Sequence, residues 1–265
     1  MENQESKVNT VKRARSGAHA HSSHAVKRRN PLRPILTFVI IVLGVLLALS
    51  VFFRVSKITV DGNSYYTEEQ IVQASGIEHG DNMFFVNRFS AASRIFAKLP
   101  YVQKVTINRK LPNHVVIEIA ESQELGYVVS GDTYWAIDSN GKVLEKVDSK
   151  KAKDLIRIDG LSLKGPKVGQ QIETKNGDTE KIEYLATILN GIQSRQMMKD
   201  IGYIDMSSAA NPVFDYKGHF TVKLGSNENL EYKLGLLVSA VEKLKENEYG
   251  VIDLSIDHQA HFSPN

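Results

Sequence analysis

The residues best suited to bind a metal ion lie near the N-terminus, where "HAHSSH" contains His19, His21 and His24. Histidine is the commonest protein ligand for transition metals, so this segment could hold a metal ion loosely. The surrounding tail is polar and basic and contains few large apolar side chains, which is typical of a disordered segment. We therefore expect these histidines to be solvated and assign no metal site.

The other potentially reactive side chains match no catalytic pattern. The chain contains no G-x-S-x-G, no H-E-x-x-H, no Walker-type phosphate loop and no S-x-x-K that opens a helix as in a penicillin-binding protein. It also contains no cysteine, which excludes disulfides, thiolate metal sites and a cysteine nucleophile. The later histidines are dispersed without zinc-ligand spacing: His79, His114, His219, His258 and His261. We expect no enzyme, no cofactor and no small-molecule substrate; a membrane-anchored cell-wall hydrolase is the alternative.

The positive charge of the chain is concentrated in its first 34 residues. The 265 residues carry a formal net charge of +3, but residues 1–34 contain eight Lys or Arg against two Glu, a net +6. The remainder is therefore −3, which argues against nucleic acid as a partner of the folded part. The hydrophobic fraction of 42% and the charged fraction of 24% are ordinary for a folded protein.

An apolar segment without charge follows the basic tail. Residues 35–53, "ILTFVIIVLGVLLALSVFF", form a run of 19 residues. At ~1.5 Å per residue, a helix of this length spans ~28 Å, close to the thickness of the hydrocarbon core of a bilayer. A buried core helix is the alternative, but the adjacent basic cluster favours a transmembrane helix.

The flanking charges predict the orientation of this span. Cytoplasmic flanks carry the excess of Lys and Arg, so residues 1–34 should stay in the cytoplasm and residues 54–265 should be translocated. A cleaved signal peptide is the alternative, because residues 48–50 resemble a weak cleavage site, but the long N-terminal region favours an uncleaved anchor. The cations that set the orientation are Lys27, Arg28, Arg29 and Arg33 before the span, against Arg54 and Lys57 after it.

The segment after the span has the order strand, helix, helix, strand, strand. A first strand ends at the turn residues 61–63. Thr67 and Gln70 form a capping box for a short helix that stops at Gly76. A second helix covers about residues 90–99, with Asn87 or Ser90 as its cap. The order predicts a three-stranded sheet with two helices on one face.

A hairpin closes this module. In residues 99–121 two alternating apolar runs flank a turn at residues 110–113, where proline and asparagine favour turn geometry. The pattern predicts two antiparallel strands with one buried face. That face consists of Val105, Ile107, Val115, Ile117 and Ile119.

Residues 54–121 resemble a POTRA domain, the polypeptide-transport-associated module. The resemblance is carried by the "V-x-G-N" strand end, the "Thr-x-x-Gln" helix, the "G-x-N-x-F" loop at Gly80, Asn82 and Phe84, and "LPYVQKVTINRKLPN". A POTRA domain directly after a single basic-flanked span is similar to the bacterial division family FtsQ/DivIB. A POTRA-type assembly chaperone not tied to division is an alternative, but the chain lacks the ~10-residue alternating strands of an outer-membrane barrel.

Beyond about residue 122 the pattern changes to short strands and tight turns. Asn140-Gly141 between apolar runs predicts a hairpin, and Thr179 begins a helix with apolar residues at helical spacing. Pro212 indicates either that its strand lies at a sheet edge or that the proline is at the start of the strand. The further strands are expected in residues 154–161, 201–207, 212–216 and 219–225.

A second helix and a final strand end this module. The helix covers about residues 230–245, and its apolar stripe is either buried against the sheet, which we favour, or a partner-binding face. In the FtsQ/DivIB family the last strand is an exposed edge to which a partner segment adds as a further strand. An interior strand is the alternative. Carried over onto this chain, the partner-binding residues are Tyr249, Val251, Ile252, Asp253, Leu254, Ser255 and Ile256.

The expected fold class is α+β, with one N-terminal transmembrane helix, a POTRA domain (β-α-α-β-β) and a β-rich α+β domain. The resemblance implies a bitopic cell-membrane scaffold at the division septum. It would link FtsL-type and DivIC/FtsB-type proteins and help regulate septal peptidoglycan synthesis. The expected parts are a cytoplasmic tail (1–34), the span (35–53), the POTRA domain (54–121), the β domain (122–257) and a C-terminal tail (258–265).

Overall fold

The computed structural model describes residues 32–245, 247–256 and 258–265. The predictions for the N-terminal tail lie outside these residues. They comprise the expected disorder, the solvated histidines His19, His21 and His24, and the orienting cations Lys27, Arg28 and Arg29.

The predicted apolar helix is confirmed as α1, Leu32–Phe52. Its 21 residues correspond to a length of ~32 Å. The mean hydropathy reaches 3.0, and protein buries none of the helix. By length and composition α1 is the one helix in the described part of the chain that could cross a membrane.

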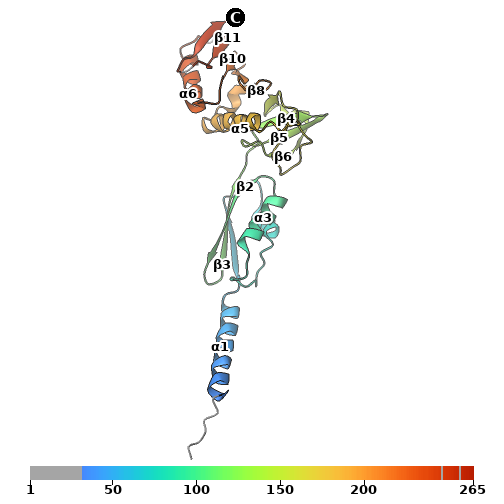
Figure 1. The fold of residues 1–265 in the computed structure, drawn as a ribbon, viewed down its shortest axis with the longest axis vertical. Helices are drawn as coiled ribbons and strands as arrows, with labels where there is room; N and C mark the ends of the chain where they lie inside the picture. The colour runs from blue at the N-terminus through green and yellow to red at the C-terminus, as the bar shows by residue number, and fades with distance from the viewer. Residues whose placement is uncertain (1–31, 246, 257) are drawn as a thin grey trace, which may run out of the picture. The chain divides into compact units, whose positions relative to one another are not determined.

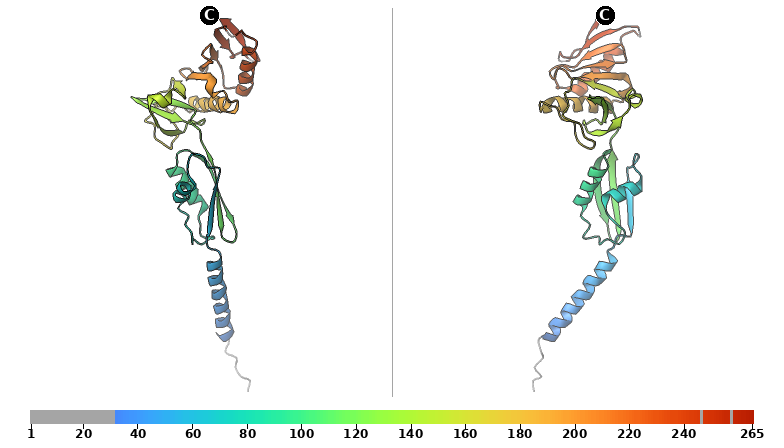
Figure 2. Two further views of the ribbon diagram at one scale, coloured as in Figure 1. Left: turned by 180° about the vertical axis from the view of Figure 1, so that it is seen from behind. Right: turned by 90° about the vertical axis from the view of Figure 1, so that its right-hand side faces the viewer.

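The predicted strand-helix-helix-strand-strand module is confirmed (Figure 1). Its central strand β3 pairs in parallel with β1 and antiparallel with β2, which gives the order β1-β3-β2. Both helices lie on the same face of this sheet (Figure 2, left). The elements are β1 Lys57–Asp61, α2 Glu68–Ser75, α3 Arg88–Lys98, β2 Val102–Lys110 and β3 His114–Glu121.

Local signals explain the helix boundaries in this module. The hydroxyl of Thr67 accepts a hydrogen bond from the backbone of Gln70, and the Gln70 side chain accepts one from the backbone of Thr67, as the capping box predicts. Gly76 ends α2 in the left-handed region, at φ 63°. Of the two candidate caps for α3, the structure uses Asn87, whose Oδ1 accepts from the Ser90 N–H at 3.0 Å.

A nine-stranded sheet follows, in the order β12-β11-β10-β9-β8-β7-β4-β5-β6. The predicted hairpin at residues 140–141 is confirmed as β5–β6, and Pro212 directly precedes β9, so it marks a strand start. Strands β4 and β12 were not predicted. The elements are β4 Gly126–Ser130, β5 Thr133–Ile137, β6 Val143–Val147, α4 Ser149–Ala152, β7 Ile156–Asp159, α5 Thr179–Ser194, the short 3-10 helix η1 Met198–Asp200, β8 Ile201–Asp205, β9 Val213–Tyr216, β10 Phe220–Lys223, α6 Leu230–Val241, β11 Gly250–Asp253 and β12 His261–Pro264.

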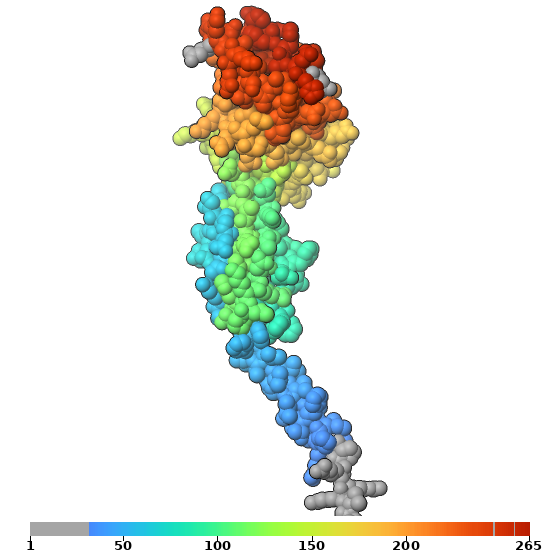
Figure 3. All heavy atoms as spheres, turned by 90° about the vertical axis from the view of Figure 1, so that its left-hand side faces the viewer, coloured from blue at the N-terminus to red at the C-terminus, as the bar shows by residue number. Residues whose placement is uncertain are grey.

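Helices α5 and α6 share one hydrophobic core with this sheet. Phe214 of β9 is fully buried, as are Leu234 and Leu237 of α6. The helices meet at Gly191, where an added Cβ would lie 2.7 Å from the Leu234 Cδ1. The stripe of α6 therefore faces the domain's own core, which excludes the partner-binding alternative for its buried residues. Figure 3 shows the residues from β8 onward, orange to red, as one continuously packed surface.

Candidate partner-binding edge

Strand β11, which holds the first predicted partner-binding residues, is paired on both sides. It runs parallel to β10 and antiparallel to β12, with Val251 opposite Ser263 and Ile252 opposite Phe262. The prediction that residues 251–253 form an exposed edge is therefore wrong, and the interior-strand alternative holds for them. The reason is that residues 261–264, which were expected to belong to a C-terminal tail, fold back and pair with them. Residues 254–256 lie beyond the end of β11.

Burial divides the seven predicted residues into three kinds. Ile252 and Leu254 are fully buried and belong to the core of the domain. Val251 and Asp253 are half-buried between the flanking strands. Tyr249, Ser255 and Ile256 are exposed, with Tyr249 and Ile256 accessible to 51% and 54%.

Backbone hydrogen bonds alternate along β11. The N–H groups of Gly250 and Leu254 donate to carbonyl oxygens on the β10 side, at 3.2 and 2.8 Å. On the other side, the Asn265 N–H donates to the Tyr249 carbonyl at 3.1 Å. Even-numbered residues of β11 therefore pair with β10 and odd-numbered residues pair with β12.

The same alternation defines the free edge of β12. Because Asn265 points its N–H toward β11, so do Ser263 and His261, two and four residues earlier. Phe262 then points its N–H and C=O away from β11, at the end of the sheet order. Pro264 presents only a carbonyl in that direction, because proline has no N–H. The edge at this end of the sheet is thus β12, and it is short.

One aromatic contact positions β12 against the sheet, and a second lies at the start of β11. The ring of Phe262 contacts that of Phe220 in β10, with centroids 6.1 Å apart and planes at 75°. Tyr249 stacks on His219, at 4.4 Å and 29°. Sequence reasoning missed this strand because "HFSP" has no alternating apolar pattern; the one signal was Phe262, an isolated aromatic residue in a polar segment.

The carboxylate of Asp253 accepts hydrogen bonds at the end of β11. Burial raises the pKa of Asp253, but hydrogen bonds from the side chain and backbone of Ser255 and the nearby charges of Lys223 and His261 lower it by more, so its pKa lies below 3.8. The Ser255 N–H donates to the Asp253 Oδ1 at 2.8 Å. Asp253 is therefore ionised at neutral pH and fixes the backbone where the chain leaves the strand.

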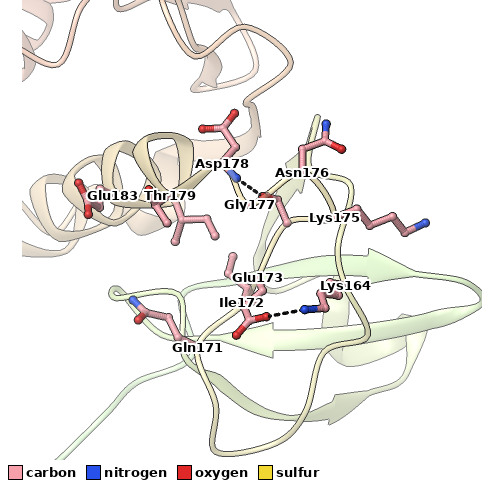
Figure 4. A pocket seen from close by; sticks show the side chains of 12 residues that line it. Lys164, Gln171, Ile172, Glu173, Lys175, Asn176, Gly177, Asp178, Thr179 and Glu183 are labelled. Carbon is pink, nitrogen blue, oxygen red and sulfur yellow. Dashed lines mark hydrogen bonds and ion pairs between the residues drawn. The ribbon is translucent and has the colours of Figure 1, made fainter.

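A cavity of about 600 Å³ lies between the loop of residues 171–178 and the start of α5 (Figure 4). Several of its polar groups have structural partners. Asp178 caps α5 by accepting from the Lys181 N–H at 3.1 Å, and its own N–H donates to the Thr174 hydroxyl at 2.7 Å. Lys164 lies 3.7 Å from Glu173, and both side chains are largely exposed. These contacts hold the loop against the start of α5.

The described histidines make separate contacts. His114 Nε2 lies 3.0 Å from the Thr59 hydroxyl, and the His258 ring contacts Tyr232 with centroids 5.2 Å apart. Within residues 32–245, 247–256 and 258–265, no three His, Cys, Asp or Glu side chains converge as a metal site would require.

Comparisons with known proteins agree with the two folded modules. Residues 53–122 match the family model of the FtsQ-type POTRA domain, and residues 126–255 match that of the C-terminal part of cell division protein FtsQ/DivIB. The second match ends before β12.

Named relatives cover most of the chain. It is 30% identical over 207 residues to cell division protein DivIB of Clostridium tetani, covering 77% of each chain. It is 30% identical over 206 residues to DivIB of Clostridium acetobutylicum, covering 77% of this chain and 80% of the relative. It is 24% identical over 197 residues to cell division protein FtsQ of Corynebacterium glutamicum, covering 74% and 82%. The chain, with its apolar helix, its POTRA domain and its β-rich domain, belongs to the FtsQ/DivIB family of cell division proteins.

Proposed function

We propose that the protein is a bitopic scaffold of the cell-division machinery, concentrated at the septum. The single apolar helix α1 and the family membership support the anchor and the division role. The excess of Lys and Arg before the span supports a cytoplasmic N-terminus and an extracellular position for residues 54–265.

The scaffold joins FtsL-type and DivIC/FtsB-type proteins and thereby helps regulate septal peptidoglycan synthesis. A partner segment adds to the nine-stranded sheet as a further strand, next to β12. The observation that carries this proposal is the place of β12 at the end of the sheet, with the N–H and C=O of Phe262 directed outward. A partner strand satisfies such groups, and its alternate side chains supply specificity.

The predicted partner-binding residues have different roles in this proposal. Val251, Ile252 and Asp253 hold β12 in place as its paired neighbours. Leu254 anchors the same segment in the core. Tyr249, Ser255 and Ile256 flank the edge with exposed side chains and contact the partner directly.

Replacement of Phe262 by proline tests strand addition. Phe262→Pro and Phe262→Ala both remove the ring, but only proline removes the outward N–H. We measure binding of full-length protein in lipid nanodiscs to immobilised extracellular segments of the FtsL-type and DivIC/FtsB-type proteins. Phe262→Pro should weaken binding about tenfold beyond Phe262→Ala, which corresponds to roughly 1.4 kcal/mol. Equal affinity of the two variants would refute pairing at β12.

The division role has a separate test, the position of a fluorescent fusion on Met1 in dividing cells. A band at mid-cell is expected. A uniform membrane ring would contradict septal concentration, and a short fluorescent fragment would show that the span is cleaved.

A further inference from the structure

Four large apolar side chains project into solvent from one end of the three-stranded module. Phe85 and Phe89 are exposed to 85% and 84%, and Phe84 and Leu111 to 54% and 60%. Phe84 and Phe85 precede α3, Phe89 lies in its first turn, and Leu111 lies in the β2–β3 turn. We call these four residues the proximal apolar surface.

The exposure of the phenylalanines is fixed by the loop that carries them. The Asn82 Oδ1 accepts from the Phe84 N–H at 2.9 Å, and the Asn82 carbonyl accepts from the Phe85 N–H at 2.9 Å. Met83 and Val86, on either side of the two rings, are buried in the core. Because Met83 and Val86 point inward, the loop directs Phe84 and Phe85 outward.

Chain connectivity places this surface near the end of the span. The Met83 N–H donates to the carbonyl of Phe53, the first residue after α1, at 2.8 Å, and the rings of Phe53 and Phe84 lie 4.9 Å apart. Phe85 is two residues beyond Met83, so its Cα lies within about 10 Å of the Phe53 carbonyl. The interfacial region on each side of the hydrocarbon core is about 5–8 Å thick. Phe84 and Phe85 are thus within reach of that region.

The hairpin turn lies at the same end of the module. The Ser56 N–H, three residues beyond Phe53, donates to the Asn113 carbonyl at 2.9 Å, two residues from Leu111. Exposed cations accompany the apolar side chains: Arg54 and Lys57 on the segment after the span, Arg88 at the start of α3 and Lys110 at the turn. The acidic residues nearby are Glu78 and Asp81, and the Asp81 carboxylate accepts from the Glu78 N–H at 3.0 Å. Cations beside phenylalanines favour a surface with anionic headgroups.

We propose that the proximal apolar surface inserts into the interface of the outer leaflet of the membrane that α1 spans. The phenylalanine rings occupy the boundary between headgroups and acyl chains, and the cations contact lipid phosphates. The POTRA domain is thereby held against the bilayer. This inference rests on the membrane anchoring of the proposed function.

Depth-dependent fluorescence quenching tests this insertion. The chain has no cysteine, so a single introduced cysteine can be labelled specifically. Full-length Phe85→Cys and Phe89→Cys variants, each with an environment-sensitive fluorophore, are placed in nanodiscs of phosphatidylcholine and phosphatidylglycerol, with spin-labelled lipids as quenchers. Gln103→Cys is the exposed control, at the opposite end of β2, ~23 Å from Lys110. Leu43→Cys, in the middle of α1, reports whether the helix lies in the bilayer.

Quenching by a shallow spin label should be several-fold stronger at positions 85 and 89 than at position 103. Equal quenching at all three, with Leu43→Cys quenched by a deep label, would overturn the insertion while the anchor stands. An unquenched Leu43→Cys would instead contradict the membrane anchoring of the proposed function.

The contacts between cations and lipid phosphates have a separate test. The double variant Arg54→Gln, Arg88→Gln should show less quenching at position 85, and this quenching should no longer depend on the content of phosphatidylglycerol. Quenching that is unaffected both by the double substitution and by omission of phosphatidylglycerol would overturn the contacts with phosphate. A spectral change at position 85 that occurs only after addition of an FtsL-type or DivIC/FtsB-type segment would assign the surface to a protein and overturn lipid insertion.

Discussion

Gly250 of β11 lies so close to Ser263 of β12 that a Cβ atom on Gly250 would be 2.2 Å from the Ser263 carbonyl oxygen. The same Cβ would lie 2.9 Å from the Phe262 ring. No real Cβ occupies such a position, and a backbone oxygen cannot move aside without moving its strand. The pairing of β12 with β11 therefore requires glycine at position 250.

Gly250→Ala should displace β12. We expect faster hydrogen exchange in residues 261–264, weaker partner binding and a loss of about 1–3 kcal/mol in the free energy of unfolding. Hydrogen exchange followed by mass spectrometry measures the first effect, and urea unfolding measures the last. The control is Gly202→Ala in β8, whose Cβ would meet only the flexible side chain of Asp215, at 2.9 Å. Unchanged exchange in Gly250→Ala would contradict the close packing of the two strands.

Asp253 makes the end of β11 sensitive to acid. Its pKa is lower in the folded protein than the ordinary 3.8, so its ionised form stabilises the fold. This contribution is fully present above the unfolded pKa and is lost as the pH falls through the folded pKa, below 3.8. The difference in unfolding free energy between wild type and Asp253→Asn should therefore be present at neutral pH and shrink in strong acid. Urea unfolding over this range measures the difference, and a difference independent of pH would contradict the assignment.

Features set by neighbouring residues could be predicted from the sequence. The capping box of Thr67 and Gln70, the stop at Gly76 and the turn at Gly141 each depend on residues within a few positions of one another. The apolar helix and the order of elements in the POTRA domain follow from composition and periodicity in the same way. Such signals do not depend on contacts with residues that are distant in the sequence.

The candidate edge could be predicted only in part. The periodicity of residues 251–256 indicates a strand that buries Ile252 and Leu254, and both are buried. Whether that strand is an edge depends on which other segment pairs with it, and periodicity carries no information on pairing. Strand β12 can pair with β11 because Gly250 has no side chain, and the contact between Phe262 and Phe220 stabilises it. Neither feature gives the segment "HFSP" the alternating apolar pattern of a strand.

Leu237 tests the assignment of the α6 stripe to the core. It is fully buried, so Leu237→Ala should lower the free energy of unfolding by about 2–5 kcal/mol. Lys243→Ala, at an exposed position after the helix, should change it by less than about 0.5 kcal/mol. Urea unfolding measures both values. Partner binding is measured without urea, at a temperature where both variants are folded. A Leu237→Ala variant that kept its stability and lost binding would support a partner-binding face instead.

Lys151 joins two carboxylates, Glu124 in the β3–β4 connection and Glu145 on β6. Its Nζ lies 2.7 Å from Glu124, whose side chain is 14% exposed, and 2.5 Å from Glu145. The Tyr101 hydroxyl also donates to Glu124. Burial lowers the pKa of Lys151, but the hydrogen bonds and charges of Glu124 and Glu145 raise it by more, so its net pKa is above 10.5.

Replacing this lysine should weaken the fold modestly at neutral pH. Lys151 is 44% exposed, so solvent screens the pair, and we expect Lys151→Met to cost roughly 1 kcal/mol in the free energy of unfolding. A raised lysine pKa stabilises the fold below the unfolded pKa, and this contribution disappears as the pH rises through the folded pKa. The cost should therefore be constant below pH 10.5, decline as the pH rises further through the folded pKa, and shrink in high salt. Lys150→Met, on the same short helix, is the control, because replacing an exposed lysine there should leave the unfolding free energy nearly unchanged. If both variants unfolded at the same urea concentration, the two carboxylates would not be held by Lys151.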